Sequence, residues 1–373
     1  MGPRFSLQTA GAWLVSSSTF GYIGAFGVYQ DYYIRTFMTS QSASAISWIG
    51  STQIGLVFMT GSVSGKLLDM GYFHWCIGIG SFIYVSRLFM LSLGHENSYY
   101  QVFLPQAIRL GIGQGLLFLP SVGIISHHFA KRRSLATGIV FTGSSCGGMM
   151  SPIILDNIIK RAGFGWGVCA TGLVVLDAAA SETYSLQGPF VGHSGVMNHR
   201  PYLLKVLGIF IAQLGIWFPI SISTICESPV VQLTILNAAS ILGRTLPNFI
   251  SDRIGVFNVM IPCSTIGGVL VFAMFGVKSS GALVVFAVLY DFFSGSFFSL
   301  MSPLIVSLAD HMHEVGPRLG FAFTVIGIST LIGTPISGAL LSDDYSVILF
   351  LAGSGRLAAT RAMRAWHKAL FRV

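Results

Sequence analysis

The chain has 373 residues, of which 53% are hydrophobic and 9% are charged, and its formal net charge is +8. A soluble protein has about 25% charged residues, and so few polar side chains could not cover a globular protein of this length. The composition therefore excludes a soluble fold and indicates a helical protein that crosses a lipid bilayer many times. Since no basic stripe alternates with aromatic residues on a polar surface, the positive charge reflects membrane topology, and we expect no nucleic-acid partner.

The apolar segments are long enough for many membrane crossings, because one helical span needs about 20 apolar residues. Ten segments meet this length: 9–29, 43–64, 73–93, 101–126, 135–158, 202–225, 228–250, 256–277, 281–308 and 319–341. Two shorter runs, 164–176 and 345–355, follow the fifth and the last of these segments. They are either interfacial segments or two clipped spans, the sixth and the twelfth.

The distribution of lysine and arginine favours twelve spans with both chain ends in the cytoplasm. With twelve spans, most basic residues fall in inner segments, including the cluster at 131–133 and a basic C-terminal tail that begins at Arg356. Basic residues are enriched in the cytoplasmic loops of membrane proteins. We therefore expect a plasma-membrane protein with two six-span halves, 1–176 and 202–373, joined by a cytoplasmic loop at 177–201.

Two motifs recur in both halves at nearly the same separation along the chain. Asp69 follows span two and Asp252 follows span eight, while Arg133 and Arg318 each precede a glycine-rich span. Similarity at a fixed separation indicates a structural repeat. Transporters built from two such halves move them against each other around a site near the middle of the membrane.

Longer stretches resemble the major facilitator superfamily. Residues 252–255, Asp-Arg-Ile-Gly, are similar to the D-R-x-G part of its loop motif, and 65–71 is a shortened version. The stretches similar to fungal monocarboxylate transporter-like proteins are 20–33, 111–129, 233–263 and 333–341. The resemblance implies an all-α fold of two six-helix halves in parallel repeat. It also implies transport of a small, often anionic solute by alternating access, with protons as a candidate co-substrate and without a cofactor.

The chain departs from this family in three places. It begins almost at the first span, the loop at 177–201 is short, and spans six and twelve are clipped. These departures keep a second interpretation open, namely a solute sensor that does not transport or an inactive truncated carrier. No phosphate-binding loop or metal-ligand spacing is found, so the sequence does not support an enzyme or a metal site.

A polar stripe on span eight supplies the candidate substrate site. Asn237, Ser240, Arg244 and Asn248 recur at helical spacing and share one narrow face of an otherwise apolar helix. Such a face meets a cavity or another helix rather than lipid. Alternatively, the apolar part of the Arg244 side chain extends along the helix, and its guanidinium group reaches water at the inner helix end. The family resemblance implies that Arg244 meets the substrate carboxylate, which its planar fork can bind with two parallel hydrogen bonds.

Further candidates for substrate or proton binding lie within other spans. Arg109 opens a stretch of span four similar to the R-x-G-x-G motif of the superfamily, and Asp291 lies too deep in span ten to reach water. Their similar positions in the repeat predict an ion pair that couples to protons, unless the two side chains never meet. Tyr22 and Tyr29 offer hydroxyl groups to a ligand or anchor span one at the membrane interface.

Glycine and charged residues at the inner helix ends form the predicted gate. The resemblance implies that they hold neighbouring helices together in the outward-open state, although charges at these ends also set the topology. The predicted gating residues are Gly65, Asp69, Gly71, Arg133, Asp252, Arg253, Gly255 and Arg318. Arg87, in contrast, is expected to extend its side chain from span three to water.

Overall fold

The described part of the chain consists of helices and short turns and contains no strand. The computed structural model describes residues 3–129, 132–162, 164, 200–214, 229–277, 279–309, 314–340, 355–358 and 360–361. The predicted all-α fold is therefore confirmed. The runs predicted as spans six and twelve, 164–176 and 345–355, lie almost entirely outside the described residues, as does most of the loop at 177–201.

Three π-helical turns interrupt the helices that precede residue 164. The α-helices of this part are α1 (Pro3–Ser16), α2 (Tyr22–Gly24), α3 (Phe26–Tyr32), α4 (Ala43–Met59), α5 (Gly61–Asp69), α6 (Phe73–Ser92), α7 (Tyr99–Phe103), α8 (Leu110–His128) and α9 (Arg133–Ala162). The π-helical turns are η1 (Ser17–Gly21), η2 (Tyr33–Phe37) and η3 (Leu104–Arg109). Such turns are rare in proteins, and those that occur are often found at functional sites.

The second half of the chain has longer and more regular helices. They are α11 (Arg200–Leu214), α13 (Pro229–Ile254), α14 (Val256–Ala273), the 3-10 turn η4 (Met274–Gly276), α15 (Ser280–Val306) and α16 (Val315–Leu340). Gly71 separates α5 from α6 with a φ of 85°, and Gly255 separates α13 from α14 with a φ of 93°. Other residues rarely adopt this conformation, so the turns of both loop motifs require their glycine.

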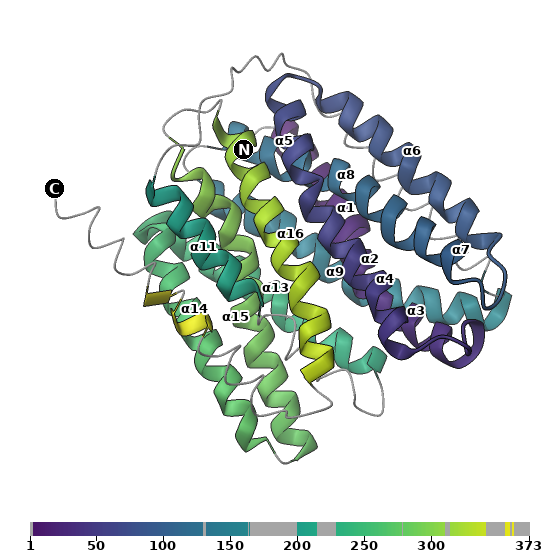
Figure 1. Ribbon diagram of the computed structural model, residues 1–373. Helices are drawn as coiled ribbons and strands as arrows, with labels where there is room; N and C mark the ends of the chain where they lie inside the picture. Colours follow the sequence, from purple (N-terminus) through teal and green to yellow (C-terminus); the bar gives the residue numbers. More distant parts are fainter. Residues whose placement is uncertain are drawn as a thin grey trace.

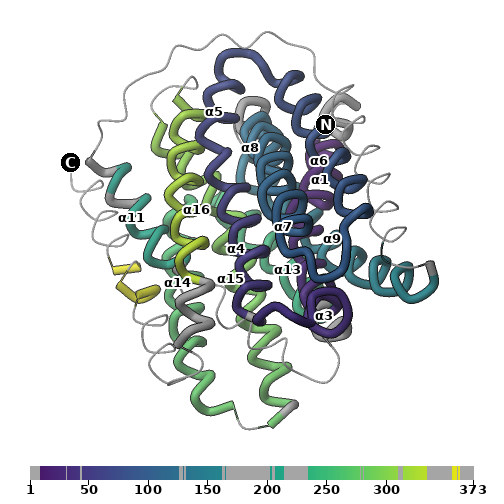
Figure 2. Tube along the Cα trace, turned by 45° about the vertical axis from the view of Figure 1, so that its right-hand side comes forward, coloured from purple at the N-terminus to yellow at the C-terminus, as the bar shows by residue number. Residues whose placement is uncertain are grey.

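The two halves meet along two sets of helices. Helix α9 of the first half packs against α13 of the second, and α16 of the second packs against α4 and α5 of the first. Figures 1 and 2 both show α16 beside α4 and α5. Glycines permit these close approaches, since a Cβ at Gly138 of α9 would overlap the backbone oxygen of Arg244 in α13. A Cβ at Gly65 of α5 would likewise overlap the backbone of Gly316 in α16.

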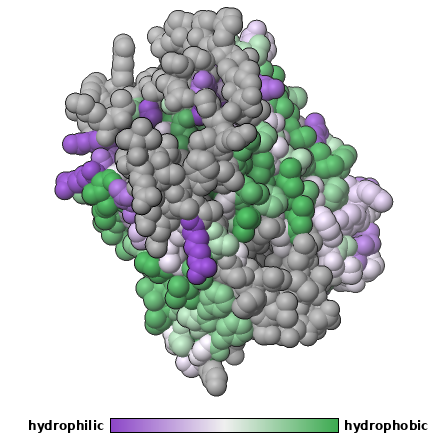
Figure 3. Space-filling model, turned by 60° about the vertical axis from the view of Figure 1, so that its left-hand side comes forward, coloured by the Kyte–Doolittle hydropathy of each residue, from purple (hydrophilic) through white to green (hydrophobic). Residues whose placement is uncertain are grey.

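The outer surface is apolar in the way that a lipid environment requires. Trp75, Phe82 and Phe89 on one face of α6 are 68%, 72% and 60% exposed, whereas Tyr84 and Leu88 on the opposite face are buried. Hydrophobic residues cover broad areas of the described surface in Figure 3. Large exposed apolar areas are rare on soluble proteins and mark contact with a membrane or a partner.

Six of the described helical segments are long and apolar enough to cross a membrane. They are Phe73–Ser92, Tyr99–Ile125, Arg133–Arg161, Val256–Gly276, Gly281–Val306 and Val315–Gly333. Their positions agree with predicted spans three, four, five, nine, ten and eleven. The chain is therefore an integral membrane protein.

Candidate functional site

Helix α13 carries the predicted polar stripe, which faces α9 and α15 at the junction of the two halves. Asn237 lies against Gly148 of α9, where a Cβ would come within 2.7 Å of the side-chain oxygen of Asn237. Asn248 is buried and donates a hydrogen bond of 2.6 Å to the hydroxyl oxygen of Ser299 on α15. Ser240 is also buried. The stripe therefore faces protein and not lipid.

Arg244 connects the two halves through its guanidinium group. Its Nε donates to Ser240 Oγ of the same helix at 3.1 Å. Its Nη1 donates to the backbone oxygen of Phe141 at 2.6 Å and to Ser144 Oγ, both on α9. Among the described residues, none accepts a hydrogen bond from Nη2. Since an arginine carries five N–H donors, the Nη2 edge of Arg244 has two donors left for an anion.

Asp291 on α15 is the carboxylate that interacts with Arg244. Its side chain is 9% exposed, and it lies close enough to Arg244 for an electrostatic interaction. Opposite charges attract each other strongly in surroundings of low dielectric constant. Arg109 contacts the sulfur atom of Met90 instead. Within the described residues, Asp291 is thus paired with Arg244. Arg109 lies apart from this pair, beside α6.

Tyr22 and Tyr29 lie side by side in the interior of the N-terminal half. Their hydroxyl groups share a hydrogen bond, and both side chains are buried. They are therefore not interface anchors. The guanidinium carbon of Arg87 lies 4.7 Å from the centre of the Tyr22 ring. Arg87 is completely buried, so the expectation that its side chain reaches water is wrong.

The predicted gate residue Asp252 caps a helix of the opposite half. Its two carboxylate oxygens accept hydrogen bonds from the backbone N–H groups of Ser134 and Leu135, both at 3.0 Å. These groups belong to the first turn of α9, where unpaired N–H donors and the helix dipole favour a negative charge. Asp252 therefore holds the end of α13 to the start of α9.

Asp69 occupies the equivalent place on the other side of the repeat. Its carboxylate lies against the backbone of Gly316 in the first turn of α16. This residue follows predicted span two, and burial raises the pKa of its carboxyl to about 7. In contrast to Asp252, neither of its carboxylate oxygens has a hydrogen-bond partner within the described structure. The two aspartates thus meet the first turns of α9 and α16, each across the junction of the halves.

The arginines of the predicted gate make contacts within their own half. Arg133 donates from Nε to the backbone oxygen of Phe129 at 3.1 Å. The Arg253 guanidinium lies 4.5 Å from the centre of the Phe249 ring. Arg318 forms an ion pair of 2.6 Å with Glu314, which lies four residues earlier in the chain. Arg253 lies at the end of α13 from which Asp252 reaches across, whereas Arg133 and Arg318 lie in the first turns of α9 and α16, which the two aspartates meet.

Arg356, expected among the cytoplasmic charges, is buried in the second half. Its side chain is 0% exposed, and its Nη1 donates to the hydroxyl oxygen of Tyr290 at 3.0 Å. Gly267 of α14 makes room for the guanidinium group, since a Cβ there would lie 2.8 Å from Nη2. The assignment of Arg356 to a solvent-exposed tail is therefore wrong, because α14 and α15 enclose its side chain.

Comparisons with known proteins bear on this arrangement. A scan of protein-family models finds no match. The agnestins efflux protein AgnL12 of Paecilomyces divaricatus is 34% identical over 91% of this chain and 81% of its own length. The MFS-type transporter dbaD of Emericella nidulans is 34% identical over 91% of this chain and 80% of its own length. The aspyridones efflux protein apdF of the same organism is 32% identical over 92% of this chain and 73% of its own length.

These alignments extend over most of both proteins in every case. The name of the dbaD relative agrees with the apolar, membrane-length helices. The chain belongs to the major facilitator superfamily of membrane transporters.

Proposed function

We propose that this transporter moves a small organic anion of the monocarboxylate type by alternating access, with Arg244 as the ligand of the anion. The observation that carries the proposal is the Nη2 edge of Arg244, which none of the described residues occupies, on a polar stripe at the junction of the halves. A carboxylate bound there would form charge-assisted hydrogen bonds, which are stronger than neutral ones.

Asp291 supplies the proposed coupling to protons. In the empty site it balances the charge of Arg244. When an anionic substrate takes over this role, the charged form of Asp291 loses its attraction to Arg244 and takes up a proton. Anion and proton would then cross together. The electrostatic interaction between Arg244 and Asp291 supports this step, since a buried carboxylate without a cation is costly.

We further propose that the aspartates of the gate close the inner side when the site faces outward. Asp252 and Asp69 each meet the first turn of a helix in the opposite half. Opening of the inner side would separate Asp252 from Ser134 and Leu135.

The plasma membrane is the proposed location, with both chain ends in the cytoplasm. A protease-sensitive tag after Val373 tests the orientation, and cleavage of the tag from outside intact cells would contradict it.

Export is the proposed direction of transport in the cell. Two relatives are named efflux proteins, for agnestins and for aspyridones, and these names support outward movement for this chain as well. The names of the relatives do not carry a cargo over to this chain, so the proposal is limited to the chemical class that an arginine fork selects.

Exchange measured in proteoliposomes tests the proposal. Vesicles that contain the purified protein and an unlabelled monocarboxylate should accumulate the labelled compound against its gradient, because a carrier exchanges solute across the membrane. An inward proton gradient should increase net uptake. Binding of the carboxylate without exchange would favour a solute sensor instead. Absence of both binding and exchange, over a panel of aliphatic and aromatic carboxylates, would contradict the assignment of an anionic substrate.

A further inference from the structure

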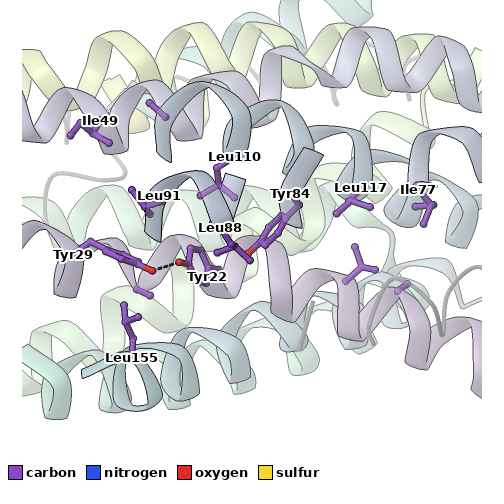
Figure 4. Packing of buried hydrophobic residues seen from close by; sticks show 14 of the residues in the cluster. Tyr22, Tyr29, Ile49, Ile77, Tyr84, Leu88, Leu91, Leu110, Leu117 and Leu155 are labelled. Carbon is purple, nitrogen blue, oxygen red and sulfur yellow. Dashed lines mark hydrogen bonds between the residues drawn. The ribbon is translucent and has the colours of Figure 1, made fainter. Parts of the chain in front are cut away.

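The N-terminal half encloses a second arginine site, which we call the Arg87 cage. It consists of Arg87 and Tyr84 on α6, Gln106 on η3, Tyr22 on α2, Tyr29 on α3 and Tyr33 on η2. Figure 4 shows Tyr22, Tyr29 and Tyr84 directed toward one another within the buried cluster, with Leu88 and Leu110 around them. All six cage side chains are almost completely buried.

The charge of Arg87 is not neutralised by any carboxylate among its described partners. Its Nη1 donates to Gln106 Oε1 at 2.7 Å. Its electrostatic partners are the hydroxyl groups of Tyr22, Tyr84 and Tyr29, and its guanidinium carbon lies 5.1 Å from the centre of the Tyr84 ring. Aromatic faces lower the cost of a buried cation. They do not replace a counter-ion.

Several donors in the cage also lack an acceptor. Within the described structure, Nε and Nη2 of Arg87, Nε2 of Gln106 and the hydroxyl group of Tyr33 have no partner in good hydrogen-bond geometry. The hydroxyl groups of Tyr22 and Tyr84 lie near the guanidinium group without meeting that geometry. Tyr22 and Tyr29 share one hydrogen bond, so one of their two hydroxyl protons is left for another acceptor. Buried donors are almost always paired. A cluster of unpaired donors around a cation therefore fits an acceptor that carries negative charge.

The backbone directs side chains into the cage with unusual turns. Tyr33 lies in η2, Gln106 lies in η3, and Tyr22 directly follows η1. These are the three π-helical turns among the described residues, and each lies in or beside a segment that contributes to the cage. A π-helical turn shifts the face on which later side chains lie, and such turns are frequent at functional sites. Three of them around one arginine indicate a site and not a packing accident.

We propose that the Arg87 cage binds a small monovalent anion, either a free halide or the carboxylate group of a solute. One fixed positive charge suits one negative charge, and the N–H and O–H groups that have no acceptor supply the hydrogen bonds. A water molecule would satisfy the donors but would leave the charge of Arg87 unbalanced. The cage is independent of the proposed transport site, because its residues lie on α6, on η3 and on α2, α3 and η2. It includes no residue of α13.

Thermal unfolding of the purified full-length protein in detergent tests this site. Chloride, bromide, acetate or benzoate replaces the sulfonate isethionate at constant ionic strength. The unfolding temperature should rise with a saturable dependence on at least one of these anions. A response to chloride and bromide identifies a free halide as the ligand, and a response to the carboxylates alone identifies the carboxylate group of a solute.

Four variants relate the effect to the cage. Tyr33→Phe removes one donor oxygen and should weaken the apparent affinity by roughly 10–150-fold, while Arg87→Gln should abolish the anion response. Tyr99→Phe is the matched control, because its hydroxyl group donates to the backbone oxygen of Ala45 outside the cage. The double variant Arg244→Gln/Asp291→Asn, which leaves no buried carboxylate without its cation at the proposed transport site, should keep the response. If Arg87→Gln does not fold, the Tyr33→Phe result stands by itself.

Three results would overturn the proposal. The first is a wild-type protein whose stability does not change with any of the anions at constant ionic strength. The second is an unaltered anion affinity in Tyr33→Phe. The third is a response that disappears in a folded Arg244→Gln/Asp291→Asn double variant, because the anion would then bind at the proposed transport site and not in the cage.

Discussion

Arg244 of α13 donates a hydrogen bond of 2.6 Å to the backbone oxygen of Phe141 on α9, so a cation of one half is held by the main chain of the other. The neighbouring Ser144 accepts a second hydrogen bond from the same Nη1 atom. An anion that recruits this guanidinium group competes with both contacts. Binding of substrate and separation of the halves would then be coupled by one side chain, because a ligand shifts a conformational equilibrium only through differential contacts.

The contact of α13 with α15 should not tolerate a side chain at Gly243. A Cβ there would overlap the backbone oxygen of Phe292, so Gly243→Ala should lower the stability by about 1–3 kcal/mol or more, as over-packing does. The thermal unfolding temperature in detergent measures this effect. Gly78→Ala is the matched control, since no atom lies within 4 Å of a Cβ at Gly78. Equal unfolding temperatures for the two variants would show that the α13–α15 approach is looser than described.

Loss of the Asp252 cap should favour opening of the inner side. Asp252→Ala removes both hydrogen bonds to the first turn of α9, and loss of a helix cap costs about 0.5–2 kcal/mol. The distance distribution between spin labels at positions 132 and 254 should therefore shift to longer values. Asp156→Asn serves as control, because Asp156 pairs with Lys160 at the surface within one helix. An unchanged distribution in Asp252→Ala would argue against a gating role of the cap.

The sequence was sufficient for features that depend on local pattern. The polar stripe of α13 follows from helical spacing, and its members do face protein. The turns at Gly71 and Gly255 follow from a motif in which glycine supplies the positive φ. The membrane-length helices follow from apolar runs of sufficient length. Each of these features is determined by residues that are close together in the chain.

Features that depend on packing between distant segments could not be predicted. The Arg87 cage combines side chains from spans one, three and four, and π-helical turns direct two of them, Tyr33 and Gln106. No sequence signal marks a π-helical turn, so Arg87 resembled an isolated arginine. The partner of Asp291 was a similar case. Depth along the span suggested Arg109, but which face of the helix a residue occupies decides its neighbour, and that neighbour is Arg244.

A double substitution distinguishes these two partners of Asp291. Arg244→Gln leaves Asp291 as a buried charge without its cation, which should reduce the amount of folded protein, because breaking a buried pair typically costs about 3–5 kcal/mol. Adding Asp291→Asn should recover much of the loss. Combining Asp291→Asn with Arg109→Gln should give no such recovery. Folded protein measured by size-exclusion chromatography reports the outcome, and recovery only in the Arg109 combination would reverse the assignment.

The role of Arg244 as an anion ligand predicts graded effects of two substitutions on transport. Arg244→Lys keeps the charge but loses the planar fork that binds a carboxylate with two parallel hydrogen bonds. Loss of one charge-assisted hydrogen bond of about 1.5–3 kcal/mol corresponds to an affinity lower by roughly 10–150-fold. Arg244→Gln should weaken transport of an anionic solute further and affect a neutral solute less.

Uptake into proteoliposomes with matched amounts of protein measures both variants. Ser299→Ala is a suitable control, because Ser299 accepts a hydrogen bond from Asn248 on the same stripe but makes no described contact with Arg244. Its effect on anion affinity should therefore be small compared with that of Arg244→Lys. If both Arg244 variants transported a carboxylate with the affinity of the wild type, Arg244 would serve only to hold α13 to α9. The substrate anion would then have to bind elsewhere at the junction of the halves.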